Sequence, residues 1–282
     1  MTARGRSDRP PGEAHVRGPA ISRREGRLGR LERAAIQGVL VREITNFGSF
    51  WRSTTFASTV DPTVYLLAFG FGFGSLVSRV QGLDYVEFVG TGIVATAVLF
   101  SSAFPAMFGT FIKYKFQRTY DAILAAPVDT EELVTAEALW LAMRAGTFGC
   151  VPMLVAIIFG LDPTPGMLAV PLIAFIAGFG WASFGIMIAG LLKSIDNFNY
   201  VTSTVITPTF LVAGTFFPLS GLPQWAQIAG NLNPLHHCVE LVRHAAFGWD
   251  VMADLGHLGA LLLFAVVMWR VAIWAMTRKL VN

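Results

Sequence analysis

The feature of this sequence that most constrains the fold is the stretch 197–239, which contains no aspartate, glutamate, lysine or arginine. As one helix it would reach about 64 Å, because each helical residue rises about 1.5 Å. The hydrocarbon core of a bilayer is only about 30 Å thick. Two full crossings would barely fit, and prolines would break them. These prolines are Pro208, Pro218, Pro223 and Pro234. The stretch therefore predicts one membrane span followed by a broken return on the far side.

The composition places the chain in a membrane. Its residues are 54% hydrophobic and 14% charged, with a mean hydropathy of +0.58, whereas soluble domains carry about 25% charged residues. A soluble fold of this composition would lack polar surface. Charge-free runs predict an all-α membrane protein with six transmembrane helices, which puts both termini on one side. The predicted spans are 62–78, 88–112, 138–161, 163–192, 197–218 and 255–277.

The basic residues predict which side the termini occupy. Seventeen of the 21 lysines and arginines fall in the terminal segments and in the loops on the same side, whereas the opposite loops hold only Arg79 and Arg243. Because positively charged loops stay in the cytoplasm, both termini are expected to be cytoplasmic. Arg144 and Arg270 interrupt two spans. They could either reach back to the headgroups or line a polar pathway.

The N-terminal sixty residues are strongly basic, with eleven arginines against five acids. Residues 1–30 are rich in arginine, glycine and proline, and are expected to form a disordered cytoplasmic tail that contacts anionic lipids. Charge alone does not indicate nucleic-acid binding, so no nucleic-acid partner is predicted. In 31–58, apolar and charged residues alternate at helical spacing. This pattern predicts an amphipathic helix along the inner membrane interface.

Two glycine-based motifs were tested against their context. The chain has no Gly-Lys pair and hence no phosphate-binding loop, so it is not expected to bind ATP itself. The glycine repeat 70–74 lies inside an apolar run, which excludes the strand-to-helix turn of a dinucleotide site. Gly70 and Gly74 are four residues apart, which instead predicts close helix packing.

One short segment has metal-ligand chemistry, and it follows the charge-free stretch. Its members are His236, His237, Cys238, Glu240 and His244. Their spacing differs from that of a His-Glu-x-x-His site and no further ligand is obvious, so no metal is predicted. They are interpreted as polar interface residues on a return helix, in which Glu240 and Arg243 can pair.

The loop 113–133 combines both signs of charge with aromatic residues. Its first part predicts a short helix that stops before Pro127, and Asp129, Glu131 and Glu132 precede the next helix. An ordinary cytoplasmic connection and a docking surface for a partner are both compatible with this pattern.

Several short strings, taken in order, resemble one family. They are 61–67 (DPTVYLL) before the glycine repeat, 118–128, 214–218 (GTFFP), 222–223, 233–235 and 240–243. Over about residues 35–280 the chain resembles the permease subunits of ABC type-2 exporters, particularly the nodulation-type lipo-oligosaccharide exporters. Ala213 stands where that family often has serine, and the N-terminal extension is longer than usual, so the subgroup and the substrate stay open.

The resemblance implies a six-span domain at 59–282 in the cytoplasmic (inner) membrane of a bacterium. Two permease chains, expected to be identical, would pair with two cytoplasmic ABC ATPase subunits that bind ATP and Mg, while this chain binds no cofactor. The residues implied in coupling to the ATPase are Arg118, Thr119, Tyr120, Asp121, Leu124 and Pro127. The segment 219–254 would be re-entrant on the outer side. The residues implied in this outer gate are Phe216, Phe217, Pro218, Trp225, Asn233, Pro234, His236, Glu240 and Arg243.

The implied function is export of an amphipathic substrate, namely a lipo-oligosaccharide, a glycolipid or a hydrophobic drug. A multidrug or antibiotic efflux permease of the same family is the first alternative. A stand-alone secondary transporter would favour inverted repeats around an ionisable site near the midplane. An intramembrane hydrolase or transferase would need paired acids or a metal set inside the bilayer. The predicted spans supply no such site.

Overall fold

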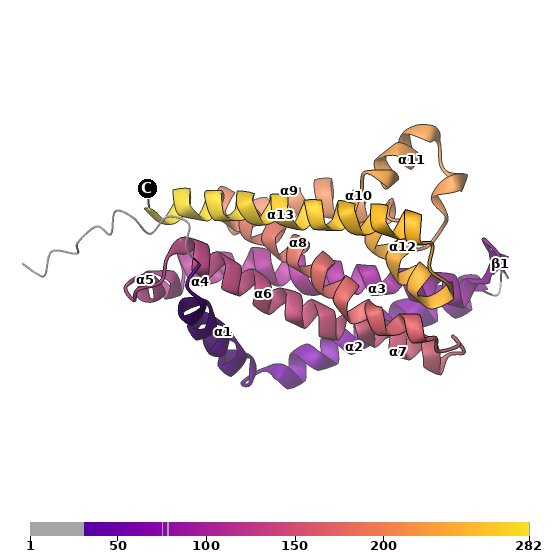
Figure 1. Ribbon diagram of the computed structural model, residues 1–282, viewed down its shortest axis with the longest axis horizontal. Coiled ribbons are helices and arrows are strands. Elements are labelled where there is room, and N and C mark those ends of the chain that lie inside the picture. The colour runs from indigo at the N-terminus through magenta and orange to yellow at the C-terminus, as the bar shows by residue number, and fades with distance from the viewer. Residues whose placement is uncertain (1–30, 75, 78, 282) are drawn as a thin grey trace, which may run out of the picture. The chain divides into compact units, whose positions relative to one another are not determined.

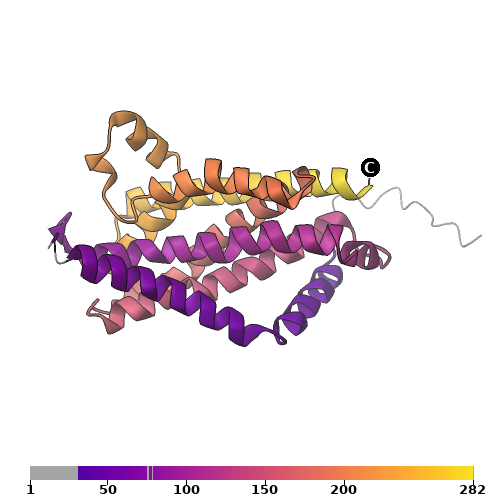
Figure 2. The ribbon, with the colours of Figure 1, turned by 180° about the vertical axis from the view of Figure 1, so that it is seen from behind.

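The computed structural model describes residues 31–281 except 75 and 78. The predicted disordered tail, 1–30, lies outside the described residues. Figures 1 and 2 show long helices lying side by side with short helices at both ends. The predicted all-α class is confirmed apart from one small hairpin, β1 (Arg79–Val80) with β2 (Leu83–Asp84). Gln81 and Gly82 both have positive φ, the geometry of a two-residue hairpin turn.

Four helices in the described part of the chain are long and apolar enough to cross a membrane. They lie at the predicted spans 88–112, 138–161, 163–192 and 255–277. The helix at 163–192 is shorter than predicted and the other three are longer, although the one at 138–161 ends at Ile158. The first joins α3 (Tyr85–Phe104), η2 (Pro105–Gly109) and α4 (Thr110–Lys115), and the second joins α6 (Thr130–Phe148) and α7 (Cys150–Ile158). The third joins η3 (Pro165–Ala169) and α8 (Val170–Leu191), and the fourth is α13 (Val251–Val281).

The first predicted span, 62–78, begins inside a longer helical segment. Helix α1 (Arg33–Phe47) precedes α2 (Trp51–Leu67), which continues into the π-helix η1 (Ala68–Phe73). The predicted amphipathic region 31–58 is therefore divided between two helices. The segment formed by α2 and η1 is not among the four long apolar helices, and a count of six spans stays a prediction.

The fifth predicted span, 197–218, ends earlier than expected. Its helical part consists of η4 (Ile195–Asn197), α9 (Phe198–Val201), η5 (Thr202–Ile206) and α10 (Thr207–Leu211). Gly214 has φ +84, a left-handed conformation that glycine adopts without steric cost. The chain turns here, so the prediction of a helix to Pro218 is wrong by about two turns. After the turn follow η6 (Leu219–Gly221), α11 (Gln224–Asn231) and α12 (Pro234–Phe247).

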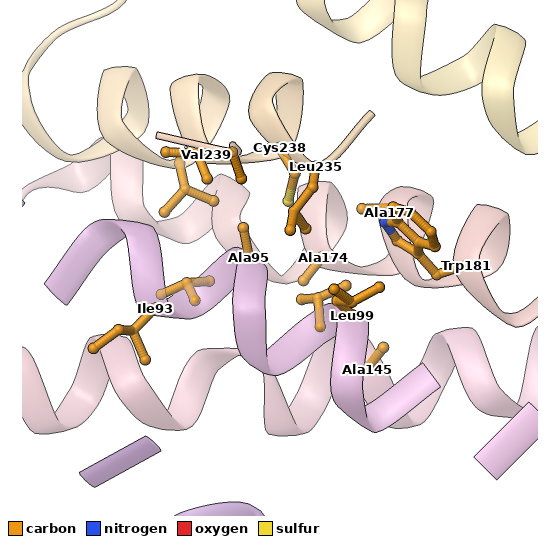
Figure 3. Packing of buried hydrophobic residues seen from close by; sticks show 14 of the residues in the cluster. Ile93, Ala95, Leu99, Ala145, Ala174, Ala177, Trp181, Leu235, Cys238 and Val239 are labelled. Carbon is orange, nitrogen blue, oxygen red and sulfur yellow. The ribbon is translucent and has the colours of Figure 1, made fainter. Parts of the chain in front are cut away.

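Helix α8 lies in the middle of the helices and packs against α3, α6 and α13. Small residues allow the close approach. A Cβ atom on Gly178 would lie 2.5 Å from Ala145 Cβ, and one on Gly185 would lie 2.5 Å from the carbonyl oxygen of Ala103. Figure 3 shows the core between α3, α6, α8 and α12, where Leu99, Trp181 and Cys238 are buried.

The long helices have two distinct ends (Figure 1). We call the end with Lys115, Thr130 and the last turn of α13 the α5 end, because it carries the short helix α5 (Thr119–Leu124). We call the opposite end, with Tyr85 and the start of α13, the α12 end. The candidate functional residues gather at these two ends.

Candidate functional site

The residues predicted to couple to an ATPase form a short helix at the α5 end. Arg118 precedes α5 with a positive φ of 53°, which turns the chain sharply after α4. The Arg118 guanidinium donates to Asp121 Oδ2 at 3.3 Å, and both side chains are more than half exposed. Pro127 is exposed, whereas Thr119 and Leu124 are half-buried. A charged and accessible face of α5 therefore points away from the helices.

Tyr120 differs from the other coupling residues because it is 1% exposed. Its hydroxyl donates a short hydrogen bond to the Glu137 carboxylate of α6. Burial, and next the charge of Glu137, raise the pKa of Tyr120 well above the ordinary value for tyrosine, so its hydroxyl stays protonated. Tyr120 cannot touch a partner directly. It fixes α5 to α6.

The Tyr120 contact belongs to a buried charged cluster that joins three further helices. Lys113 Nζ at the end of α4 lies 2.8 Å from Glu43 Oε2 of α1 and 2.9 Å from Glu137 Oε1. Thr110 donates to Glu137 at 3.2 Å, and Arg42 donates to Glu43 at 2.7 Å. Glu43 and Glu137 are 5% and 3% exposed. Carboxylates this buried require such partners. We call Glu43, Lys113, Tyr120 and Glu137 the lysine cluster.

A groove of about 410 Å³ lies between α1 and the residues that follow α5. Glu32, Ala34, Ala35, Gly38, Val39 and Arg42 line one side, and Ile123, Ala126, Pro127 and Val128 line the other. The groove is mostly apolar with charged residues at its edge. It borders the exposed face of α5, so both features present one surface at the α5 end.

An apolar pocket of about 500 Å³ lies toward the α12 end, between the α2–η1 segment, the hairpin and residues 210–218. It is lined by Tyr65, Phe69, Phe73, Val77, Val80, Tyr85, Phe210, Leu211, Phe216, Phe217 and Pro218. The Phe216 ring lies 4.4 Å from that of Phe69 and 5.4 Å from that of Phe210, measured between centroids. Three of the predicted gate residues, Phe216, Phe217 and Pro218, therefore line this aromatic pocket.

Helix α12 holds the loop 212–218 that forms one wall of the pocket. The ring of His236 binds the Ala213 carbonyl through Nδ1 at 3.0 Å, and Arg243 donates to the Gly214 carbonyl at 3.2 Å. Arg243 also donates to Glu240 at 2.6 Å. The guanidinium lies 4.0 Å above the Phe88 ring of α3. Burial lowers the pKa of Arg243, while the Glu240 carboxylate favours its charged form.

Two other predicted gate residues shape the start of α12. Asn233 accepts the N–H of Leu235 at 2.9 Å, which caps the helix, and its amide donates to the Thr209 carbonyl at 2.7 Å. Pro234 occupies the first turn, where a missing N–H costs nothing. Trp225 of α11 is 72% exposed, so it stands apart from the pocket and from the rest of the predicted gate.

The histidines of α12 meet a fourth histidine that the sequence interpretation missed. His237 Nδ1 lies 2.8 Å from Nδ1 of His257 in α13, and His244 Nδ1 lies 2.6 Å from Asp254 Oδ1. The spacing of His257, His237 and Glu240 in the sequence gives no signal, because the chain turns between α12 and α13. No group of three His, Cys, Asp or Glu side chains that could hold a metal ion occurs in the described part of the chain.

Gly70 and Gly74 do not pack closely within the chain. A Cβ on Gly70 would lie 3.5 Å from Val86, and one on Gly74 would lie 3.8 Å from Tyr85, which are ordinary contacts. Their role in packing between chains stays a prediction. Of the two arginines inside predicted spans, Arg144 lies 5.2 Å from the Phe47 ring centroid and Arg270 is exposed beside Trp269.

The sequence is similar to known membrane transport proteins. Residues 34–247 match the family model described as ABC-2 type transporter. Nodulation protein J of Sinorhizobium fredii (strain NBRC 101917 / NGR234) is 32% identical over 237 residues, which cover 82% of this chain and 90% of that protein. Nodulation protein J of Rhizobium meliloti (strain 1021) is 33% identical over 77% of this chain and 84% of that protein. Inner membrane transport permease YadH of Escherichia coli (strain K12) is 23% identical over 245 residues, which cover 87% of this chain and 95% of that protein.

Proposed function

Because the chain belongs to the ABC-2 type transporter family, we propose that it is the membrane-spanning permease subunit of an ATP-driven exporter. A separate cytoplasmic ABC ATPase subunit supplies the ATP hydrolysis. The observation that carries this proposal is α5, a short helix with an exposed charged face and one fully buried anchor, Tyr120. A helix of this kind can be moved by a bound partner and can transmit that movement to the helices against which it packs.

The contacts of the lysine cluster can transmit that movement from α5 to the other helices. It links α5 through Tyr120 to α6, and α6 through Lys113 to both α4 and α1. Because buried ion pairs resist separation, these four helices move as a unit when α5 moves. Helix α4 continues through η2 into α3, which reaches the aromatic pocket at the other end. The movement of α5 can therefore change the pocket.

We further propose that the α5 end faces the cytoplasm and the α12 end faces outward. The α5 end carries Lys113, Lys115, Arg118, Lys193, Arg278 and Lys279. This bias agrees with the rule that positive residues flank membrane spans on the cytoplasmic side. In this orientation α1 lies at the inner interface, and α11 and α12 form the outer, re-entrant segment.

The proposed assembly contains two copies of this chain and two ATPase subunits. Large apolar residues support a contact between copies, because Val64, Tyr65 and Phe73 of the α2–η1 segment are 55%, 44% and 50% exposed. Tyr65 and Phe73 also line the aromatic pocket. A second copy against this face would place the two pockets near each other around a shared pathway.

The proposed substrate is amphipathic, and the aromatic pocket would take its apolar part. None of the described residues that line the pocket is charged, and one of its tyrosines, Tyr85, already points its hydroxyl at the Phe216 carbonyl. A pocket of this size and character suits an acyl chain or an aromatic drug. The nodulation names of the relatives favour a lipo-oligosaccharide or glycolipid. A hydrophobic drug is the second candidate, because aromatic contacts are permissive.

The coupling test uses the complex of the full chain with the ABC ATPase of its own host, reconstituted in lipid nanodiscs. Arg118→Ala with Asp121→Ala should reduce ATPase binding and lipid-dependent ATP hydrolysis at least fivefold, because both side chains belong to the exposed face. Arg79→Ala is the matched control, since Arg79 forms a similarly exposed pair with Asp84 at the other end. Unchanged assembly and hydrolysis in the double variant would exclude α5 as the docking site.

The substrate test compares the lipids and glycolipids of cells with and without the gene. A substrate should accumulate inside the cells that lack it. Phe69→Ala with Phe216→Ala should reproduce this accumulation, whereas Trp225→Ala, outside the pocket, should not. If drug resistance changes while the lipids do not, the efflux alternative is favoured.

A further inference from the structure

The α12 end contains a histidine cluster that neither the coupling surface nor the aromatic pocket uses. Four of the five histidines of the chain are in it. His257 of α13 is central, with its ring centroid 5.1 Å from that of His237 and 6.1 Å from those of His236 and His244. Protons taken up by these rings would act on one another strongly.

The closest contact in the cluster is favourable only while at most one of its two rings is protonated. Nδ1 of His237 and Nδ1 of His257 lie 2.8 Å apart. A hydrogen bond at this distance needs one donor and one acceptor, which two neutral rings or one neutral and one protonated ring provide. When both rings are protonated, two N–H groups and two positive charges face each other. The contact then becomes repulsive.

The other two histidines have a carboxylate within 4.0 Å, whereas Glu240 acts on His237, and Glu240 and Asp254 act on His257, from farther away. His244 pairs with Asp254 at 2.6 Å and lies 4.0 Å from Glu240, while His236 lies 3.9 Å from Glu240. Arg243 donates to Oε1 of Glu240 at 2.6 Å, the same oxygen that His236 approaches. The remaining neighbours are uncharged, namely the Phe88 ring from α3, the Ala213 and Gly214 carbonyls, and the Asn231 backbone from α11. Thr164, which precedes η3, also reaches α12 through the Ala245 and Ala246 carbonyls.

We propose that His237 and His257 form a proton-sensitive latch that holds α12 against α13 while at most one of the two rings is protonated, and releases α12 when both are. The carboxylate-paired His244 keeps its contact on protonation, because Asp254 stabilises the imidazolium. Among the described side chains, the latch is the hydrogen bond between the two helices that acid converts from attractive to repulsive.

The latch lies beside the wall of the aromatic pocket. Helix α12 holds the loop 212–218 through His236 and Arg243, so a shift of α12 away from α13 would move that wall. Control of substrate release by the pH of the outer medium rests on the proposed function. The latch itself depends only on the contact between α12 and α13, and not on the proposed function.

The direction of the pH effect follows from the latched state. Burial, and next the neighbouring rings of His257 and His236, lower the pKa of His237 to about 4, whereas a solvated histidine titrates at about 6.5. A group whose pKa is lower in the latched state favours that state at high pH. The preference is complete above about pH 6.5 and is lost as the pH falls toward 4. Each proton that the released state binds and the latched state does not changes the ratio of the two states by up to about tenfold per pH unit in this window.

The test measures the distance between α11 and the start of α13 in the full chain, in phosphatidylcholine nanodiscs with EDTA. Cys150→Ser and Cys238→Ala remove the native thiols, and spin labels are attached at Trp225→Cys and Met252→Cys, both on side chains that are more than 70% exposed. Double electron–electron resonance should give one distance at about pH 7.5. A longer distance should grow at least fivefold in population at about pH 4.5.

Two variants and one control decide the outcome. His257→Gln and His237→Gln each leave the latch with a single titrating ring. The fivefold rise in the population of the longer distance should then fall below twofold. Asp250→Asn changes an exposed acid beside the start of α13 and should keep the full response. A wild-type distance that does not depend on pH, or a full response in both glutamine variants, would overturn the latch. Neither result depends on the ATPase or on export, so the latch and the proposed function can fail separately.

Discussion

The two ends of the molecule both join helices through buried polar groups, but the groups are of different kinds. At the α5 end, Lys113 sits between two carboxylates, Glu43 and Glu137. At the α12 end, the closest contact joins two histidines, His237 and His257. The lysine cluster is held by ion pairs, whereas histidines change their charge within the physiological range.

This difference indicates different mechanical roles. A buried cluster held by ion pairs suits a part that must transmit a movement, as expected where an ATPase docks. A cluster that changes its charge suits a part that must open and close, as expected at an outer exit. Each of the following predictions breaks one end and compares it with the other, from the largest expected effect to the smallest.

Lys113→Met should have the largest effect on stability. The variant leaves the carboxylates of Glu43 and Glu137 buried without their shared cation, which costs about 3 kcal/mol or more. Thermal unfolding of the full chain in detergent should begin at the α5 end, with increased hydrogen exchange in α1 and α5. Lys115→Met is the control, because Lys115 is exposed one turn away and should change stability by less than about 0.5 kcal/mol.

Arg243→Gln should be the most damaging single change at the α12 end. It removes a buried cation that binds Glu240 and the Gly214 carbonyl, and hydrogen bonds to charged groups contribute about 1.5–3 kcal/mol. Glu240 is only partly buried, so its charge is less costly to leave than those of the lysine cluster. Hydrogen exchange should become faster in 212–218 and should not change in α5. An equal effect at both ends would mean that the two clusters are not independent.

Tyr120→Phe should produce a smaller loss at the α5 end, about 1–2 kcal/mol. The ring still fills its buried position, but Glu137 loses one hydrogen-bond donor. Because the exposed face of α5 is unchanged, the ATPase should still bind, while ATP hydrolysis should respond less to the substrate. Tyr114→Phe serves as the matched tyrosine control. Loss of ATPase binding in Tyr120→Phe would contradict the division between an outer face and an inner anchor.

Acid should separate the two ends with the smallest effect. The lowered pKa of His237 stabilises the fold above about pH 6.5 and ceases to do so toward pH 4. His237 is half exposed, so solvent screening limits the loss to about 1 kcal/mol, or a fall of about 2–4 °C in Tm. His237→Gln should flatten this part of the pH profile relative to wild type. A profile that is unchanged by the substitution would place the acid sensitivity elsewhere.

The sequence predicted some elements well because their signals are local. Long charge-free runs located the helices at Tyr85–Lys115, Thr130–Ile158, Pro165–Leu191 and Val251–Leu280, and one proline placed the end of the short α5 region. The end of the fifth predicted span was wrong because Gly214 turns the chain. An apolar run does not reveal where a helix stops inside it, since the helix and the turn both consist of uncharged residues.

The charged and titratable clusters could not be predicted for a different reason. Glu43 and Lys113 are 70 residues apart in sequence, and His237 and His257 are 20 residues apart. Each residue alone was compatible with a solvated surface. Tyr120 was placed in the docking set because its segment resembles the coupling helix of the family, and periodicity over six residues does not distinguish the inner face of a helix from the outer one.

The sequence by itself determined that this chain is a helical membrane protein, where its longest helices lie and where its short connecting helix ends. Hydropathy and proline act over a few neighbouring residues, and the linear order of residues records them completely. Only the tertiary structure decided which charges become partners, which residues line the aromatic pocket and that four histidines meet at one end. Those contacts join segments far apart in the chain, and their strength depends on burial, which no single segment possesses until the helices pack.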